Sequence, residues 1–232
     1  MLQSYSAKTG VYEITNVCYQ DSQAFLLTPT QLPVMQARCD MEADSGGWTV
    51  ILRRKSNVSP QVNFTRNWKE YENGFGDLNT EFWYGLQNMH CLTSRDTMQL
   101  RVELNHSNGT GLTWTYHHFR IDGPENDYRL HIGRGEGPSG AHDAMRSHNG
   151  KPFTTFDNDN DDNPNNCASH WKGGWWFHSG CYHSFPTGPH TVTNTYDQIK
   201  WWERGLTYTY FPHVEMKIRR KSCPKPKPKE NC

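Results

Sequence analysis

The chain has 232 residues, and its 24 Lys and Arg side chains balance 24 Asp and Glu side chains at a net charge of zero. This balance excludes the broad positive field that attracts nucleic acids and acidic membranes, so a partner must be recognised locally. The longest apolar run, Trp48 to Leu52, is far shorter than the roughly 20 residues that span a membrane.

The first half of the chain is predicted to be mainly β-structure. Strands are expected at residues 10–14, at 34–39 and from Trp48 onward, where β-branched and aromatic residues lie between turn-forming residues. Between Asn67 and Leu86, helix formers mix with aromatics at near-helical spacing, which predicts two short helices. Residues 98–104 and 112–121 alternate apolar and polar side chains, as the two strands of a hairpin do.

The second half is predicted to be dominated by loops. Residues 133–198 hold most of the Gly, Asn, Asp and His and show little periodicity, and long loop regions usually carry function. Residues 214–220, V-E-M-K-I-R-R, alternate like a half-buried strand. The proline- and lysine-rich residues 223–232 are expected to form an extended tail.

Two features indicate an extracellular protein. Sequons for N-glycosylation occur at Asn57, Asn63, Asn105 and Asn108. Seven cysteines, without a repeated C-x-x-C pair, fit a disulfide-bonded domain better than a structural zinc site. The opening residues M-L-Q-S-Y-S-A-K lack the apolar segment of a signal peptide, so we expect a mature or trimmed fragment of a secreted protein.

An acidic run, F-D-N-D-N-D-D-N-P-N-N-C at 156–167, lies inside the loop-rich half. Its alternating aspartates suggest a calcium loop, in which carboxylate and carbonyl oxygens bind the ion at about 2.3–2.6 Å. An EF-hand is excluded, because its sixth and twelfth positions require Gly and Glu and are Asp162 and Ala168 here. An irregular calcium loop and a solvated acidic turn are the alternatives. Flanking aromatic blocks favour calcium, because unneutralised carboxylates are costly beside apolar groups.

Six sequence blocks resemble the fibrinogen-related domain family. In chain order they are G-G-W-T-V at 46–50, W-K-E-Y-E-N-G-F-G at 68–76, E-F-W-Y-G-L at 81–86, H-N-G-K-P-F-T-T-F-D-N-D-N-D at 148–161, N-C-A-S-H-W-K-G-G-W-W-F at 166–177 and E-M-K-I-R at 215–219. The resemblance spans nearly the whole chain and implies one α+β domain at 1–222. Its implied parts are an N-terminal β unit (1–47), a central antiparallel sheet with short helices (48–132 plus 210–222) and a loop-rich calcium- and ligand-binding part (133–209).

The resemblance also implies a calcium (Ca²⁺) site in the acidic run. The family pattern assigns the ion to two aspartate carboxylates and to two backbone carbonyls further along the chain. The corresponding residues are Asp159, Asp161, Asn163 and Asn165. Asp157 would then lie beside the site without binding the ion.

The cysteines are expected to form disulfides. The family pairs the two cysteines that correspond to Cys167 and Cys181; a zinc site formed with His170 and His183 is the alternative, but an oxidising compartment favours the disulfide. Cys39 corresponds to the second member of an N-terminal bridge whose usual first member would precede residue 1. Cys18 is the candidate partner. The remaining Cys91, Cys223 and Cys232 would give one bridge and one odd thiol, which allows a link to another chain.

Lectin-like members of the family bind acetylated sugars in an aromatic pocket beside the second bridge cysteine. The resemblance implies a cis peptide bond between Gly180 and Cys181 and backbone amides that read the acetyl oxygen. The implied pocket residues are Trp171, Cys181, Tyr182, Tyr196 and Asp197. Tyr182 and the segment after it depart from the family pattern, so the pocket wall is expected to be rebuilt.

These inferences predict a secreted, calcium-dependent recognition module that binds acetylated glycans like a lectin. The alternative is a domain that binds a protein or a receptor, as in angiopoietin-like ligands. An enzyme is the least supported class: His170, His178 and His183 lie beside serines, but no nucleophile motif such as G-x-S-x-G accompanies them. Most tryptophans at 171–176 and 201–202 are expected in the core, with one or two lining a pocket.

Overall fold

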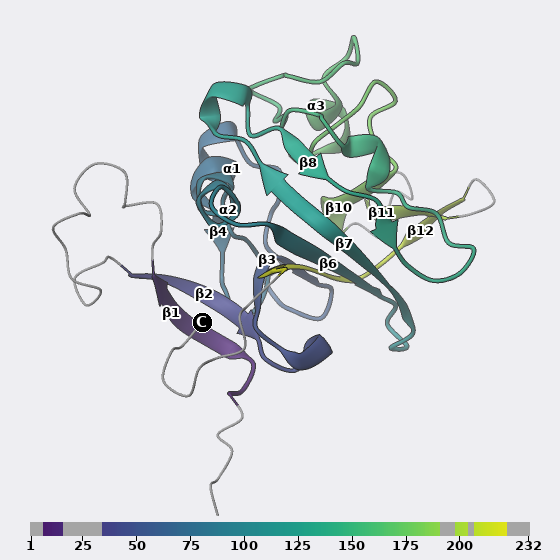
Figure 1. Ribbon diagram of the computed structural model, residues 1–232. Coiled ribbons are helices and arrows are strands. Elements are labelled where there is room, and N and C mark those ends of the chain that lie inside the picture. Colours follow the sequence, from purple (N-terminus) through teal and green to yellow (C-terminus); the bar gives the residue numbers. More distant parts are fainter. Residues whose placement is uncertain (1–6, 16–33, 191–197, 204–206, 222–232) are drawn as a thin grey trace, which may run out of the picture.

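A computed structural model describes residues 7–15, 34–190, 198–203 and 207–221. Its main sheet is antiparallel and follows the order β1-β2-β3-β13-β6-β7-β8 (Figure 1). The bounds are β1 Gly10–Thr15, β2 Val34–Asp40, β3 Trp48–Lys55, β6 Met98–Asn105, β7 Gly111–Ile121, β8 Leu130–Ile132 and β13 His213–Arg220. The predicted strands and the predicted hairpin are therefore confirmed.

The last strand completes the centre of this sheet. β13 pairs with β3 on one side and with β6 on the other, although β3 and β13 are far apart in sequence. Alternate residues of β6 are buried, as the apolar–polar alternation predicts, and in β13 Val214, Met216 and Ile218 are buried together with Lys217. β2 joins β3 through two residue pairs, Cys39–Thr49 and Asp40–Trp48, so the N-terminal strands extend the same sheet.

One of the two helices predicted between Asn67 and Leu86 is present. α1 (Trp68–Asn73) begins with a capping box between Asn67 and Glu70. The second prediction is wrong: β4 (Phe75–Gly76) pairs there with β5 (Phe82–Trp83), and α2 (Leu86–Thr93) begins where the helix was expected to end. Gly76 explains the difference. Its φ is +94°, and a Cβ on it would lie 2.2 Å from the Glu81 carbonyl oxygen, so the chain folds back too tightly for a helix.

The loop-rich half contains one more regular unit than predicted. Residues 133–183 hold little regular structure, as expected, but β10 (Ser184–His190), β11 (Gln198–Glu203) and β12 (Thr207–Tyr210) form a three-stranded sheet. Pro186 and Pro189 concealed β10, because prolines are rare in strands. They are tolerated here since β10 is an edge strand with an irregular register. The remaining elements are β9 (Gly135–Glu136), α3 (Cys167–Trp171) and the 3₁₀ turns Ala43–Ser45, Pro124–Asn126 and Arg146–His148.

An aromatic cluster connects the main sheet to the loop-rich half. The Trp83 ring lies 5.4 Å from Tyr71, 5.7 Å from Phe153 and 6.0 Å from Trp176, and all four residues are at most 1% exposed. Trp175 and Trp201 are buried as well, which confirms that most tryptophans serve the core. No helix in the described part of the chain is long and apolar enough to cross a membrane.

Candidate calcium and ligand site

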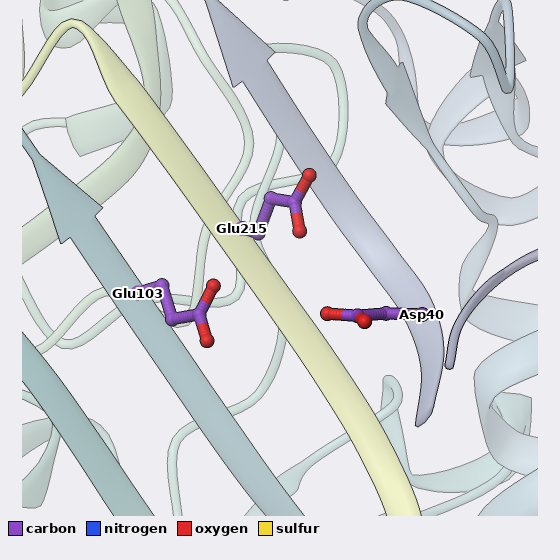
Figure 2. A group of neighbouring side chains, drawn as sticks. All are labelled: Asp40, Glu103 and Glu215. Carbon is purple, nitrogen blue, oxygen red and sulfur yellow. The ribbon is translucent and has the colours of Figure 1, made fainter. Parts of the chain in front are cut away.

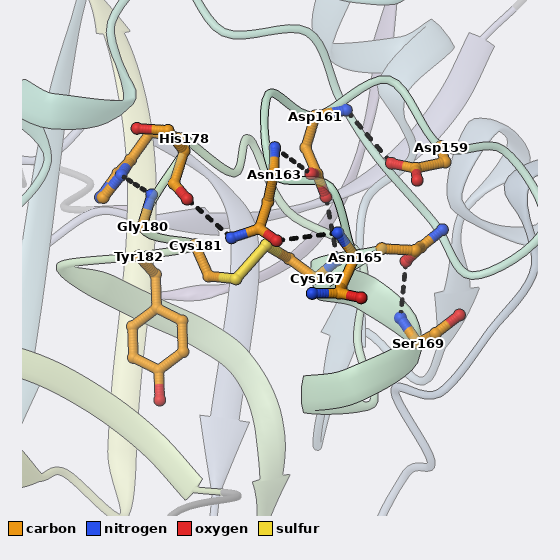
Figure 3. Close-up of a disulfide and its surroundings, with 12 residues drawn as sticks. Asp159, Asp161, Asn163, Asn165, Cys167, Ser169, His178, Gly180, Cys181 and Tyr182 are labelled. Carbon is orange, nitrogen blue, oxygen red and sulfur yellow. Dashed lines mark hydrogen bonds between the residues drawn. A yellow bond between two sulfur atoms is a disulfide. The ribbon is translucent and has the colours of Figure 1, made fainter.

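The acidic run folds as a chain of short side-chain-to-backbone turns (Figure 3). Asp159 Oδ1 accepts the amide of Asp161 at 3.3 Å, Asp161 Oδ1 accepts that of Asn163 at 2.9 Å, and Asn163 Oδ1 accepts that of Asn165 at 2.9 Å. Each acceptor lies two residues before its donor, which is the geometry that Asp and Asn favour in turns. The alternating sequence therefore fixes the path of the loop.

Asp161 is the electrostatic centre of this loop. Its Oδ2 accepts the amide of Cys167 at 3.0 Å, which fastens the loop to the start of α3. Burial, and to a smaller extent the neighbouring Asp159, raise the pKa of Asp161 above its usual value, although the amides of Cys167 and Asn163 oppose the shift. Among the described residues, no Lys, Arg or His forms an ion pair with Asp159 or Asp161.

The neighbouring aspartates have other roles. Asp157 Oδ1 accepts the amide of Trp68 at 2.9 Å and the Thr155 hydroxyl at 2.8 Å, so it holds the start of α1 against the loop. Asp162 forms an ion pair with Lys151, which lowers the pKa of the Asp162 carboxyl. Asp157 is thus used by α1 and Asp162 by Lys151, whereas Asp159 and Asp161 have only backbone amides of the loop and of α3 as partners within the described structure.

The loop fits a calcium ion by the chemistry of its donors. Two uncompensated carboxylates lie together, and the carbonyl oxygens of Asn163 and Asn165 accept no hydrogen bond from a described residue. Carboxylate and carbonyl oxygens are the ligands that calcium prefers, and a cation there would offset the burial of Asp161.

A second carboxylate group, Asp40, Glu103 and Glu215, lies on β2, β6 and β13 of the main sheet (Figure 2). It already has a cation. The Lys217 ammonium contacts Asp40, lies 2.8 Å from Glu103 and 3.4 Å from Glu215, and its side chain is 1% exposed. Arg53 and Arg101 also pair with Glu215 and Glu103, so this group is a balanced ion network within the sheet and not a metal site.

The disulfide between Cys167 and Cys181 is present, with a Cα–Cα distance of 5.6 Å. The prediction is confirmed and the zinc alternative is wrong. A second contact connects the same two segments: the Asn163 side-chain amide donates to the Ser179 carbonyl at 2.7 Å. The acidic run and the segment around Cys181 are thus joined by a covalent bond and a hydrogen bond.

Breaking this disulfide should destabilise the domain. A Cys167→Ser, Cys181→Ser double variant is expected to lose about 3 kcal/mol of unfolding free energy, the chain-entropy value for a closed loop of about 15 residues. Urea unfolding of the variant and the wild type measures the difference. An unchanged urea midpoint would show that the bridge does not constrain the fold.

The N-terminal bridge prediction is wrong. Cys39 is a free thiol, 5% exposed and directed into the core of the sheet, and burial raises its pKa. Cys18, the candidate partner, lies outside the described residues, as do Cys223 and Cys232. Cys91 is disulfide-bonded. The prediction was wrong because Cys39 was matched to a cysteine that forms a bridge in the family. In this chain its side chain faces inward from β2, which makes it a core residue.

The peptide between Gly180 and Cys181 is not cis. Within the described residues the cis peptide bond is Ser59–Pro60, so this prediction is also wrong. Residues 178–182 form a tight turn instead: Cys181 donates to the His178 carbonyl at 2.7 Å, Gly180 to His178 Nδ1 at 3.0 Å, and Tyr182 to the Gly180 carbonyl at 3.1 Å. Hence the amides of Gly180, Cys181 and Tyr182, which lie around the peptide bond expected to face a sugar acetyl group, each have an acceptor already.

The pocket residues form a packed ring cluster. Tyr182 is 5% exposed, and its ring lies 5.0 Å from Phe185, 5.2 Å from Trp171 and 5.5 Å from Tyr208. Trp171 is half-buried. Tyr196 and Asp197 lie outside the described residues, so their expected part in the pocket stays a prediction.

Tyr208 is the member of this cluster that the sequence analysis missed. It is 43% exposed, and its hydroxyl donates to the Tyr182 carbonyl at 2.9 Å. The missing signal is the register of β11 and β12, which places Tyr208 opposite Trp202. The surface beside Cys181 therefore presents an exposed aromatic ring supported by buried ones.

The histidine-rich segment does not assemble a catalytic site. His178 Nδ1 accepts a backbone amide, and His183 Nδ1 lies 3.0 Å from Ser147 Oγ. No carboxylate in the described structure pairs with His183, so the orienting group of a Ser–His–Asp arrangement is missing from these residues.

Comparison with known proteins places the chain in a family. The family described as "Fibrinogen beta and gamma chains, C-terminal globular domain" matches residues 11–221. Fibrinogen-like protein A of Apostichopus parvimensis is 38% identical over 91% of the chain and 75% of its own length. Angiopoietin-related protein 2 of Homo sapiens is 38% identical over 87% of the chain, but the chain spans 41% of that protein.

Solved structures agree with these matches. The fibrinogen-like globe domain of human ANGPTL6 superposes with a TM-score of 0.78 at 34% identity, over 94% of this chain and 90% of that one. Lamprey fibrin D-dimer, complexed with the peptide Gly-His-Arg-Pro-amide, gives a TM-score of 0.76 at 26% identity, over 97% and 75%. The chain belongs to the family of fibrinogen C-terminal globular domains.

Proposed function

We propose that the chain is an extracellular recognition domain that binds a protein ligand or receptor beside Cys181. The observation that carries this proposal is the closed turn at residues 178–182, in which the amides of Gly180, Cys181 and Tyr182 have acceptors and the Tyr182 ring is buried. Among the described residues, the surface beside this turn presents the exposed ring of Tyr208, and exposed aromatic rings are characteristic of protein-binding surfaces. Angiopoietin-related relatives, and a solved relative with a bound peptide, support the same class of ligand.

The extracellular location rests on covalent chemistry. The disulfide between Cys167 and Cys181 and the bonded state of Cys91 fit an oxidising compartment, and three of the four sequon asparagines, Asn57, Asn63 and Asn108, are exposed. The domain is inferred to be a binding module and not an enzyme, since a nucleophile, base and oxyanion donor are not brought together in the described structure.

Calcium is assigned a structural role in this proposal. Asp159 and Asp161 would hold the ion with their carboxylates, and Asn163 and Asn165 with their carbonyls. The bound ion would supply the positive charge that the half-buried Asp161 lacks. Because Asn163 contacts Ser179 and Cys167 is bonded to Cys181, a fixed loop would also fix the ligand surface.

An acetylated glycan is the second candidate ligand. The exposed ring of Tyr208 and the half-buried ring of Trp171, which both pack against Tyr182, favour it, because aromatic faces suit the apolar side of a sugar ring. In this reading Tyr196 and Asp197 would complete the pocket, and the 178–182 turn would open to free an amide for the acetyl oxygen.

Binding of the fluorescently labelled domain to cells of the source organism separates the two ligands. We expect proteinase K treatment of the cells to abolish binding, and sialidase or peptide N-glycosidase treatment to leave it unchanged. A glycan array should stay blank in calcium. Signal on acetylated glycans, or loss of cell binding after glycosidase treatment, would replace the protein ligand with the glycan.

Substitutions of Tyr208 test whether the ligand binds at this surface. Tyr208→Ala should weaken cell binding at least tenfold, about 1.4 kcal/mol, because it removes the exposed ring. Tyr208→Phe is the matched control, since it keeps the ring and loses only the hydroxyl bond to Tyr182. Equal binding by the alanine variant and the wild type would place the ligand elsewhere on the domain.

A further inference from the structure

The segment between β6 and β7 holds two sequons that are adjacent in sequence, at 105–107 and 108–110, but differ in structure. Asn105, in N-H-S, is the last residue of β6 and is half-buried. Asn108, in N-G-T, lies in the turn and is exposed. Only two residues lie between the two asparagines, so their structural surroundings decide which of them can carry an oligosaccharide.

Asn108 presents its side-chain nitrogen to solvent. Its Oδ1 accepts both the amide of Thr110 at 3.0 Å and the Thr110 hydroxyl at 2.7 Å, so both contacts fall on the oxygen. Nδ2 makes no hydrogen bond to a described residue. The space around the turn is open: Gly109 has a φ of +82°, and a Cβ placed on it would meet no atom within 4 Å. An attached sugar can leave this position without displacing protein.

Asn105 is part of the main sheet, and both its backbone and its side chain make contacts there. Its backbone pairs with Gly111 on one side and with His213 on the other. Its side chain lies across Gly111, where a Cβ would come within 2.4 Å of Asn105 Oδ1. The same side chain lines a polar hollow with Arg53, Glu103 and His213. A branched oligosaccharide on Asn105 would have to displace these groups.

We infer that Asn108 is the N-glycosylated residue of this turn and that Asn105 is unmodified. In the reaction, Asn108 Nδ2 forms a bond to C1 of the first sugar, and the bond from C1 to the pyrophosphate of a lipid-linked oligosaccharide breaks. The lipid pyrophosphate leaves with the bonding pair, and one amide proton passes to solvent. The Thr110 hydroxyl, bonded to Oδ1, is the sequon group that supports this asparagine.

Figure 1 shows β7 running from this turn toward the half of the molecule that holds α3, so the turn lies at the other end of β7. The ring of His106, in the turn, lies 4.6 Å from that of Phe211, which follows β12. A glycan on Asn108 would cover the exposed end of the β6–β7 hairpin, where an unpaired strand end is open to contacts with other chains.

The test is site-specific mass spectrometry of the protein secreted from animal cells behind a signal peptide. Peptide N-glycosidase in ¹⁸O water converts each glycosylated Asn to a labelled Asp. In the wild type we expect the label at Asn108 and not at Asn105. The inference rests on the extracellular part of the proposed function but not on ligand binding, which the assay does not use, so failure of either is recognised separately.

Three variants complete the test. Thr110→Ala should remove the label from Asn108, Thr110→Ser should restore it, and Ser107→Ala, which destroys the Asn105 sequon alone, should change nothing. Label at Asn105 in the wild type, or an unlabelled Asn108 in the secreted protein, would overturn the inference.

Discussion

Replacing Glu81 with alanine is expected to lower the unfolding free energy by about 3–5 kcal/mol, the cost of leaving a buried charge without its partner. The Glu81 side chain is 0% exposed and that of Arg54 is 1% exposed. Glu81 accepts Arg54 Nε at 3.3 Å, His190 Nε2 at 2.6 Å and the amides of Lys55 and Val62, both at 2.9 Å. Burial alone would raise the pKa of Glu81, but these partners hold it at about 2.

The network also holds the two sheets together. The Arg54 guanidinium, which comes from β3, donates to the carbonyls of Pro186 at 2.9 Å and Gly188 at 2.6 Å in β10. Removing Glu81 therefore leaves the buried Arg54 guanidinium without its carboxylate partner, between the main sheet and the sheet formed by β10, β11 and β12. The loss should exceed that of any single surface contact.

Asp96→Ala is the matched control. Asp96 pairs with Arg220 at 2.9 Å, but the two side chains are 42% and 52% exposed, so this change should cost less than about 1 kcal/mol. Urea unfolding of both variants gives the comparison. If Glu81→Ala lost no more stability than Asp96→Ala, the buried network would not have the role assigned to it.

Acidification should also destabilise the domain strongly, through His148. This residue is fully buried; its Nδ1 lies 2.6 Å from the Trp176 carbonyl, and its Nε2 accepts the amides of His183 at 3.3 Å and Ser184 at 3.2 Å. The ring is therefore held neutral, with its proton on Nδ1. Burial, with smaller contributions from His178, His183 and Lys151, lowers its pKa to about 3.

The sign of the pH effect follows from this lowered pKa. Above pH 6.5 the ring is neutral in both the folded and the unfolded state, so the protonation of His148 does not change the unfolding free energy. As the pH falls below 6.5, His148 binds a proton in the unfolded state but not in the folded state. The unfolding free energy therefore falls by about 1.4 kcal/mol per pH unit until the pKa of the folded state is reached. Between pH 6.5 and 4.5 the loss is about 2 kcal/mol, and across the whole window about 4–5 kcal/mol.

Urea unfolding at several pH values measures this slope, and His117→Gln is the control. His117 is 45% exposed, so His117→Gln removes a histidine of the surface and leaves the buried one in place. His148→Gln should reduce the slope of unfolding free energy against pH by about 1.4 kcal/mol per pH unit, the contribution of one proton. NMR titration of the wild type gives an independent check: a His148 ring that titrates near pH 6.5 in the folded protein would contradict the account.

Local sequence patterns predicted the elements that depend on local chemistry. The alternation in residues 98–104 and 214–220 predicted β6 and β13 because each strand has one buried face. The acidic run predicted a turn-rich loop because Asp and Asn side chains bond to amides two residues ahead.

The wrong or missing predictions depend on contacts between residues that are not neighbours in the sequence. Gly76 turns where the Glu81 backbone approaches it, and Tyr208 reaches Tyr182 only through the register of β11 and β12. Cys39 lies where a bridge cysteine was expected, but the sheet places its thiol in the core. Neither the direction of a side chain nor the partner of an amide in the 178–182 turn follows from spacing along the chain.

The calcium loop is tested most directly by thermal unfolding of three proteins, each in millimolar calcium and in chelator. Asp161→Asn removes a proposed ligand, and Asp162→Asn removes the adjacent charge, which already pairs with Lys151. An ion that binds only the folded state stabilises it by about 2.7 kcal/mol at a hundredfold excess over its Kd, a shift of several degrees in Tm. The account predicts this shift for the wild type and for Asp162→Asn, and none for Asp161→Asn. Identical melting curves of the wild type in calcium and chelator, or an undiminished shift in Asp161→Asn, would contradict it.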